Sequence, residues 1–222
     1  MDKSGLNPAR EGAGSEKGDG VLLYGGSFNP IHIGHIRLAL EAREKLRHLL
    51  DEIVFMPAYW PPHKDPRGLL PFSLRAGMIR KSVARYPFMR CSELEGERGG
   101  PSYTIDTVRL FREKNPDRAV YFLIGSQDFL LLPEWRDGLE LLVLVNLVVA
   151  PRGDFSFADL DAATRAMRPD VRAREAALAA GEGGPIYFPV HFLDISSSMI
   201  REKWLRNENI DYLTPARVVA SL

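Results

Sequence analysis

Two histidines, His32 and His35, stand three positions apart in a stretch whose composition suits phosphate binding. The stretch is residues 25–35, which read GGSFNPIHIGH. Gly25 and Gly26 let the backbone turn sharply and approach a ligand closely, because glycine has no Cβ. The pattern that follows is that of a helix, whose first N–H groups and partial positive charge attract anions. Since imidazoles can donate hydrogen bonds to phosphoryl oxygens, the stretch predicts a phosphate site.

Each part of this stretch has a simpler explanation when it is taken alone. Paired glycines after a strand are common, and a lone histidine is more often structural or on the surface. The two histidines could also bind a metal, but no third ligand of suitable type lies nearby in the sequence. The whole string, between a strand and a helix, is what favours phosphate. It is not a Walker A loop, since no Gly-Lys-Ser/Thr follows, and it is not the G-x-G-x-x-G fingerprint.

A second candidate for phosphate chemistry lies near the C-terminus, where residues 195–201 read ISSSMIR. Small hydroxyl side chains at the start of a helix cap its N–H groups and can contact phosphate. Arg201, one turn further on, can present its planar fork to phosphate oxygens. Three serines alone are an ordinary helix cap. Together with the histidine stretch they predict the binding site of a triphosphate.

The elements that must position these groups follow from the apolar pattern. Short unbroken apolar runs predict buried strands, and stripes with a period near four predict amphipathic helices. We expect strands at Val21–Tyr24, Glu52–Met56, Met89–Glu95, Ala119–Ile124 and Leu144–Val149. We expect helices at Gly34–Leu50, Ser73–Tyr86, Thr104–Lys114, Leu139–Leu142 and Ala158–Ala180, with a further helix opening near Ser197.

Apolar strands that alternate with amphipathic helices indicate an α/β fold, a Rossmann-like, doubly wound parallel sheet with helices on both faces. Such sheets bind ligands at the carboxyl ends of their strands. The loops after Tyr24, Met56 and Ile124 are therefore expected to carry the chemistry.

Composition narrows the setting of the protein. Lys and Arg together number 29, as do Asp and Glu, so the zero net charge argues against nucleic acid as the main partner. The one cysteine, Cys91, excludes an intramolecular disulfide and suits a reducing compartment. Neither a signal peptide nor an apolar run long enough to span a membrane is visible, so we expect a cytoplasmic protein. Residues 1–19 read as a flexible tail and residues 20–222 as a single domain.

The two motifs resemble those of the HxGH nucleotidyltransferase superfamily, and the fit is best to the bacterial nicotinate-mononucleotide adenylyltransferases. Further segments resemble this family in order along the chain: PPHK at 61–64, GPSYTIDT at 100–107, LPEW at 132–135, Pro151-Arg152, and YLTP at 212–215. The resemblance extends over residues 20–220. Phosphopantetheine adenylyltransferases share the two phosphate motifs but lack the SYTxDT and PxW segments.

The resemblance implies transfer of AMP from ATP to nicotinate mononucleotide, giving nicotinate adenine dinucleotide and pyrophosphate, with Mg²⁺ carried by the ATP phosphates. A homo-oligomer is possible. His32, His35 and Arg201 would be catalytic. ATP would contact Gly25, Gly26, Ser27, Phe28, Gly34, Ile195, Ser196, Ser197 and Ser198. The mononucleotide would contact His63, Lys64, Ser102, Tyr103, Thr104, Asp106, Gly125, Gln127, Asp128, Trp135 and Arg152, with its pyridine ring stacked on Trp135 and the N–H groups near Tyr103 and Thr104 toward its carboxylate.

The chain departs from the family pattern at two positions. Asn29 stands where many relatives have Asp, and both are short turn-forming residues. The family's G-x-D reads GSQD at residues 125–128, so Gln127 takes the Asp position if the count runs back from Trp135, or Asp128 takes its role. Three other functions stay open from the sequence: a phosphopantetheine or cytidylyl enzyme of the same fold, a non-catalytic nucleotide sensor, and a structural protein. Preference for the acid or the amide mononucleotide is also open.

Overall fold

The computed structural model describes residues 18–62, 64–151, 158–160, 162–167, 185–188, 190–191 and 193–220. Most of the predicted tail, and most of the predicted helix at Ala158–Ala180, lie outside these residues; within that segment, residues 158–160 and 162–167 are helical.

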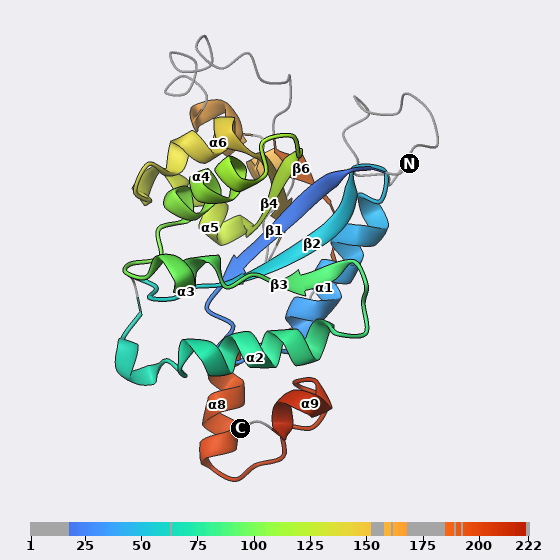
Figure 1. Ribbon diagram of the computed structural model, residues 1–222, viewed down its shortest axis with the longest axis vertical. Coiled ribbons are helices and arrows are strands. Elements are labelled where there is room, and N and C mark those ends of the chain that lie inside the picture. The colour runs from blue at the N-terminus through green and yellow to red at the C-terminus, as the bar shows by residue number, and fades with distance from the viewer. Residues whose placement is uncertain are drawn as a thin grey trace.

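A six-stranded parallel sheet forms the centre of the molecule (Figure 1). Its strands are β1 (Gly20–Gly26), β2 (Leu50–Pro57), β3 (Met89–Cys91), β4 (Val120–Gly125), β5 (Asn146–Ala150) and β6 (Ile186–Tyr187). They lie in the order β3-β2-β1-β4-β5-β6, and every neighbouring pair is parallel. This is the strand order of the doubly wound dinucleotide-binding fold, in which the chain reverses its direction of travel between β1 and β4. The predicted fold class is confirmed.

Helices cover both faces of the sheet (Figure 1). They are α1 (Ile33–Lys45), α2 (Phe72–Val83), α3 (Leu94–Arg98), α4 (Thr104–Lys114), α5 (Ser126–Leu130), α6 (Leu141–Leu144), α8 (Ser197–Leu205) and α9 (Ala216–Val219), with short 3₁₀ turns η2 (Pro66–Gly68), η3 (Leu132–Glu134) and η4 (Gly138–Glu140). Among the described residues, none of these helices has the length and apolar character needed to cross a membrane.

The core is split by the sheet into two clusters. Along β1, Leu22 and Tyr24 pack into the cluster that includes residues of α1 and α2, whereas Val21 and Leu23 pack into the cluster that includes residues of α4, α5 and α6. Alternation is the geometry of a strand, whose successive side chains point to opposite faces. The apolar run at Val21–Tyr24 has no polar position because both faces of β1 are covered.

Several predicted boundaries need correction. The first predicted helix does not reach Leu50: α1 ends at Lys45, and Leu50 opens β2, where it pairs with Gly20 of β1. An apolar stripe cannot show where a helix gives way to a strand when both bury leucines. The prediction of a strand through Glu95 is also wrong, because β3 stops at Cys91 and Leu94 and Glu95 belong to α3.

Candidate active site

A cavity lies at the carboxyl ends of β1 and β4, where the strand order reverses. Its volume is about 590 Å³, within the range of small-molecule sites. Its lining includes the loop after β1, the loop after β2, the segment from Ser102 to Thr104, the end of β4 with Asp128, the region around Trp135, and the start of α8.

A buried aromatic residue anchors the loop after β1. Phe28 is 1% exposed, and its ring lies 5.4 Å from Tyr24, 5.6 Å from Phe55 and 5.0 Å from His35, measured between centroids. Its φ is 44°, a left-handed conformation that side chains rarely adopt. A Cβ at Gly26 would lie 3.2 Å from the Phe28 ring, so the glycine leaves room for this packing.

Asn29 holds the same loop from its other side. Its amide nitrogen donates a hydrogen bond to the carbonyl oxygen of Gly68 at 2.8 Å, and its amide oxygen accepts one from the N–H of Leu70 at 2.9 Å. An ionised aspartate could only accept. The Asn29 departure therefore preserves the turn and adds a donor that ties it to the segment before α2.

The two histidines lie together at the start of α1. His32 is the N-cap residue, and its backbone N–H donates to Nδ1 of His35 at 3.2 Å. Their ring centroids are 3.6 Å apart, with planes inclined by 31°, and both rings line the cavity. Because Nδ1 of His35 accepts a hydrogen bond, the neutral ring carries its proton on Nε2, which is then a donor.

The second motif reaches the histidine loop directly. Ser196 caps α8 by accepting a hydrogen bond from the N–H of Met199 at 3.1 Å. The Ser197 hydroxyl donates to the carbonyl of Pro30 at 2.9 Å, and Arg201 donates to the carbonyl of Asn29 at 2.7 Å. The structure therefore brings the two motifs into direct contact.

Lys64 connects the loops after β1 and β2. Its Nζ donates to the Ser27 hydroxyl at 2.9 Å and faces the cavity. Burial, reinforced by the positive charge of Arg201, holds the pKa of Lys64 below its usual value, while Asp128 opposes that shift. Together Lys64 and Arg201 make this part of the cavity positively charged, which suits a polyphosphate.

Arg75 of α2 supports these loops from beneath, and the sequence did not single it out. It is fully buried, and its guanidinium donates to the carbonyls of Ser27 at 2.8 Å, Ala58 at 2.7 Å and Leu70 at 2.8 Å. Burial lowers the pKa of Arg75 to about 10. One feature of the sequence could have pointed to Arg75. It lies one turn before Ile79, on the apolar side of a predicted helix, where an unpaired arginine is rare.

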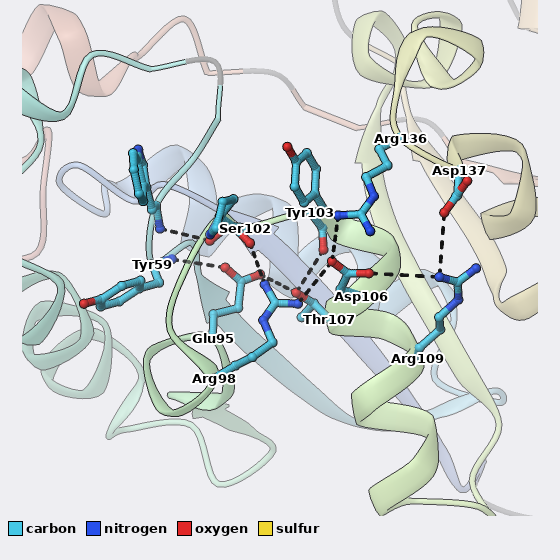
Figure 2. A network of polar contacts seen from close by, with 12 residues as sticks. Tyr59, Glu95, Arg98, Ser102, Tyr103, Asp106, Thr107, Arg109, Arg136 and Asp137 are labelled. Carbon is cyan, nitrogen blue, oxygen red and sulfur yellow. Dashed lines mark hydrogen bonds and ion pairs between the residues drawn. The ribbon is translucent and has the colours of Figure 1, made fainter.

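Glu95 of α3 is a second residue that the sequence did not single out. Its carboxylate is buried and accepts hydrogen bonds from the backbone N–H of Tyr59 at 3.1 Å and from the Thr107 hydroxyl at 2.7 Å (Figure 2). Next to it, the backbone N–H of Trp60 donates to the Ser102 hydroxyl at 3.0 Å. These bonds fix the edge of the cavity where Ser102, Tyr103 and Thr104 lie.

Most of the predicted site residues meet in this one cavity. Its lining includes Gly25, Gly26, Ser27, Phe28, His32, Gly34, His35, Lys64, Ser102, Tyr103, Thr104, Gly125, Asp128, Trp135, Ile195, Ser196, Ser197, Ser198 and Arg201. Asp106 and Gln127 are not part of the lining. Asp106 lies on α4 among three arginines. His63 and Arg152 fall outside the described residues.

Of the two candidates for the family aspartate, Asp128 is the one that faces the cavity. Its carboxylate turns back toward Gly125, where a Cβ would lie 3.8 Å from Oδ2. Gln127, its neighbour on α5, is exposed and lies outside the lining.

Comparison with known proteins adds independent information. The family model described as cytidylyltransferase-like matches residues 23–203. A probable nicotinate-nucleotide adenylyltransferase from Pelobacter propionicus is 41% identical over 204 residues, which are 90% of this chain and 94% of the relative. The protein of the same description from Geobacter metallireducens is 39% identical over 200 residues, 88% of this chain and 92% of the relative.

Solved structures agree on the fold. The nicotinic acid mononucleotide adenylyltransferase of Plasmodium falciparum, complexed with NaAD, aligns with a TM-score of 0.67 at 19% identity, covering 91% of this chain and 94% of that chain. Because the family model spans most of the chain and these bacterial relatives align with nearly all of it, the chain belongs to the nicotinate-nucleotide adenylyltransferase family of cytidylyltransferase-like enzymes.

Proposed function

We propose that this cavity transfers the AMP part of ATP to the phosphate of nicotinate mononucleotide, giving nicotinate adenine dinucleotide and pyrophosphate. The observation that carries the proposal is the direct contact between the two phosphate motifs, through Arg201 and the Asn29 carbonyl at 2.7 Å. Groups that could bind a triphosphate from opposite ends of the chain thus face one space, as adenylyl transfer requires. The names of the family relatives supply the acceptor.

The reaction needs no covalent intermediate on the protein. A phosphate oxygen of the mononucleotide is already an anionic nucleophile, and it attacks the α-phosphorus of ATP while the bond to the β-phosphate oxygen breaks. Catalysis then consists of holding the reactants in line and stabilising the charge that moves to the leaving pyrophosphate. We assign His32 and His35 to oxygens of the α- and β-phosphates, and Arg201 with the N–H of Ser197 to the rest of the triphosphate.

The mononucleotide occupies the other half of the cavity in this proposal. Lys64 holds its phosphate, with His63 and Arg152 as further candidates from the sequence. Its pyridine ring stacks on Trp135, since an electron-poor ring suits an indole face. Asp128 faces the ribose hydroxyls, the role that the family aspartate would have.

Mg²⁺ is expected to enter with ATP. The lining includes the imidazoles of His32 and His35, the ammonium of Lys64 and the guanidinium of Arg201, which complement phosphate oxygens. The ion would therefore be held by the phosphates and water, as Mg²⁺ prefers. When bound, it would neutralise part of the charge of the pyrophosphate. Composition and the single cysteine favour a cytoplasmic setting for the reaction.

Pyrophosphate release tests the proposal directly. The purified protein is given ATP, Mg²⁺ and, in parallel, nicotinate mononucleotide, nicotinamide mononucleotide or phosphopantetheine. We expect release with nicotinate mononucleotide. Release with phosphopantetheine alone would assign a different acceptor, and ATP binding without release would indicate a sensor.

The variant His35→Ala gives the matched test of the site. Loss of one preorganised donor to the transition state should raise the barrier by about 2.7–4 kcal/mol, roughly a 10²–10³-fold loss of kcat. The variant His48→Ala, beyond the end of α1 and away from the cavity lining, is the control and should keep its activity. Near-normal turnover by His35→Ala would contradict the assignment.

A further inference from the structure

Three arginines surround one carboxylate at the edge of the cavity. The carboxylate of Asp106 lies 3.4 Å from Arg136, 3.8 Å from Arg98 and 4.0 Å from Arg109, measured to guanidinium nitrogens (Figure 2). These residues come from α3, α4 and the turn after Trp135. Three guanidinium groups therefore lie within 4.0 Å of the Asp106 carboxylate.

Arg109 has carboxylate partners of its own. It pairs with Asp137 at 3.7 Å and with Glu140 in a closer contact. Arg98 and Arg136 therefore share Asp106, since the ion pairs described for both of them lead to that one carboxylate. In the described part of the chain, two positive charges thus face this one carboxylate.

Arg136 is the arginine of this cluster that lines the cavity. Its guanidinium carbon lies 4.6 Å from the centroid of the Tyr103 ring, a cation–π arrangement that fixes the side chain over this ring. Tyr103 and Trp135 also line the cavity, and Trp135 is the neighbour of Arg136 in the chain. Arg136 is thus next to Trp135, the residue to which the pyridine ring is assigned, and its side chain is 54% exposed.

Arg136 retains donor capacity toward a ligand. Its contact with Asp106 is a 3.4 Å bond from one terminal nitrogen, whereas a guanidinium carries five N–H donors in a planar fork. The lining holds two carboxylates, Glu95 and Asp128, and Glu95 accepts hydrogen bonds from the Tyr59 N–H and the Thr107 hydroxyl. Both oxygens of the Glu95 carboxylate are therefore hydrogen-bonded within the protein.

We propose that Arg136 binds the carboxylate of the pyridine ring and makes the enzyme prefer the acid mononucleotide over its amide. The inference rests on the proposed function and names the chemical group that the site selects. A carboxylate gains a charge-assisted hydrogen bond from the guanidinium. A carboxamide is neutral, and its NH₂ group would meet another donor if it turned that way.

Steady-state kinetics with both mononucleotides test this selectivity. The variant Arg136→Gln removes the charge and the fork, and we expect kcat/KM for nicotinate mononucleotide to fall about 10-fold, the effect of one charge-assisted hydrogen bond at a half-exposed position. The loss should come from KM. Activity with nicotinamide mononucleotide and the KM for ATP should stay within about twofold of wild type, and Arg136→Lys should retain part of the preference.

The control is Arg109→Gln, which removes an arginine of the same cluster that does not line the cavity. It should leave the ratio of the two kcat/KM values unchanged. Equal losses for acid and amide in Arg136→Gln would overturn the inference, because both substrates share the phosphate and ribose and a contact with either would affect them alike. An absence of turnover by the wild-type protein with every acceptor would instead overturn the proposed function, and the inference with it.

Discussion

The guanidinium of Arg201 donates a hydrogen bond to the backbone carbonyl of Asn29, 172 positions earlier in the chain, at 2.7 Å. Arg201 also lies 3.2 Å from the Ser198 hydroxyl, so its side chain is directed along the start of α8 toward the loop after β1. The parallel sheet makes the contact possible, because the carboxyl ends of all its strands lie on one edge. The contact ties the two phosphate-binding segments together, and preorganisation of this kind lowers the reorganisation needed during the reaction.

Arg201→Ala removes both the contact with Asn29 and a donor to the triphosphate. We expect kcat/KM for ATP to fall about 10²–10³-fold, as for loss of a preorganised donor. Arg201→Lys keeps the charge without the planar fork, so its kcat/KM for ATP should lie between those of the wild type and Arg201→Ala. Pyrophosphate release measures both. The control is Arg206→Ala, an exposed arginine at the end of α8 that pairs with Glu208, and activity of Arg201→Ala equal to that control would contradict the role.

Substitutions at Asp128 and Gln127 should affect kcat/KM for the mononucleotide differently. Asp128→Asn removes the carboxylate that faces the cavity, and we expect kcat/KM for the mononucleotide to fall about 10-fold, the magnitude of one hydrogen bond to a charged group. Gln127→Ala should change it less than about twofold, since an exposed side chain outside the lining is usually neutral. The reverse result would return the role of the family aspartate to Gln127.

Arg75→Met tests the support beneath the loops. Its removal takes a donor from the half-buried carbonyls of Ser27, Ala58 and Leu70. We expect the free energy of unfolding to fall by about 1–3 kcal/mol, the cost of leaving an acceptor unpaired in the interior. Urea denaturation measures the loss. Arg80→Met, an exposed position on the same helix, should lose less than about 1 kcal/mol, and equal losses in the two variants would contradict this role for Arg75.

The lowered pKa of Glu41 should make the stability of the protein depend on pH. Although burial disfavours its charge, the backbone N–H of His191 and the Arg37 guanidinium hold the pKa of Glu41 below its usual value. A carboxyl whose pKa is depressed by folding stabilises the protein above its unfolded pKa, and this contribution is lost as pH falls through the folded value.

Glu41→Gln removes that contribution, so its unfolding free energy should decline less than that of the wild type between about pH 5 and about pH 3. Urea denaturation at both pH values measures the difference. The control Glu44→Gln, whose side chain is 62% exposed, should follow the wild type. A decline in Glu41→Gln as steep as in the wild type would show that this carboxyl does not contribute.

Local patterns predicted a large part of the fold and of the candidate site. The limits of α4 agree with the prediction at both ends, Thr104 and Lys114, because its amphipathic stripe and its neighbouring Gly-Pro segment are both local signals. The phosphate loop was predictable for the same reason: its glycines and histidines act within a single stretch between β1 and α1.

The remaining features depend on long-range contacts that no local pattern encodes. Arg75 acquires its role from carbonyls in three different loops, and its sequence position shows only a charge on an apolar helix face. Asp128, and not Gln127, lines the cavity because of where α5 begins, at Ser126. The sequence did not predict this helix. Arg136 depends on where Tyr103 and Asp106 lie after folding.

A crystal structure with a non-hydrolysable ATP analogue most directly tests whether residues 25–35 and residues 195–201 bind the same nucleotide. It should place Nε2 of His35 and the Arg201 guanidinium within hydrogen-bonding distance, about 2.7–3.2 Å, of phosphate oxygens on one bound molecule. A triphosphate within hydrogen-bonding distance of only one of these two side chains would contradict the claim that both segments bind it.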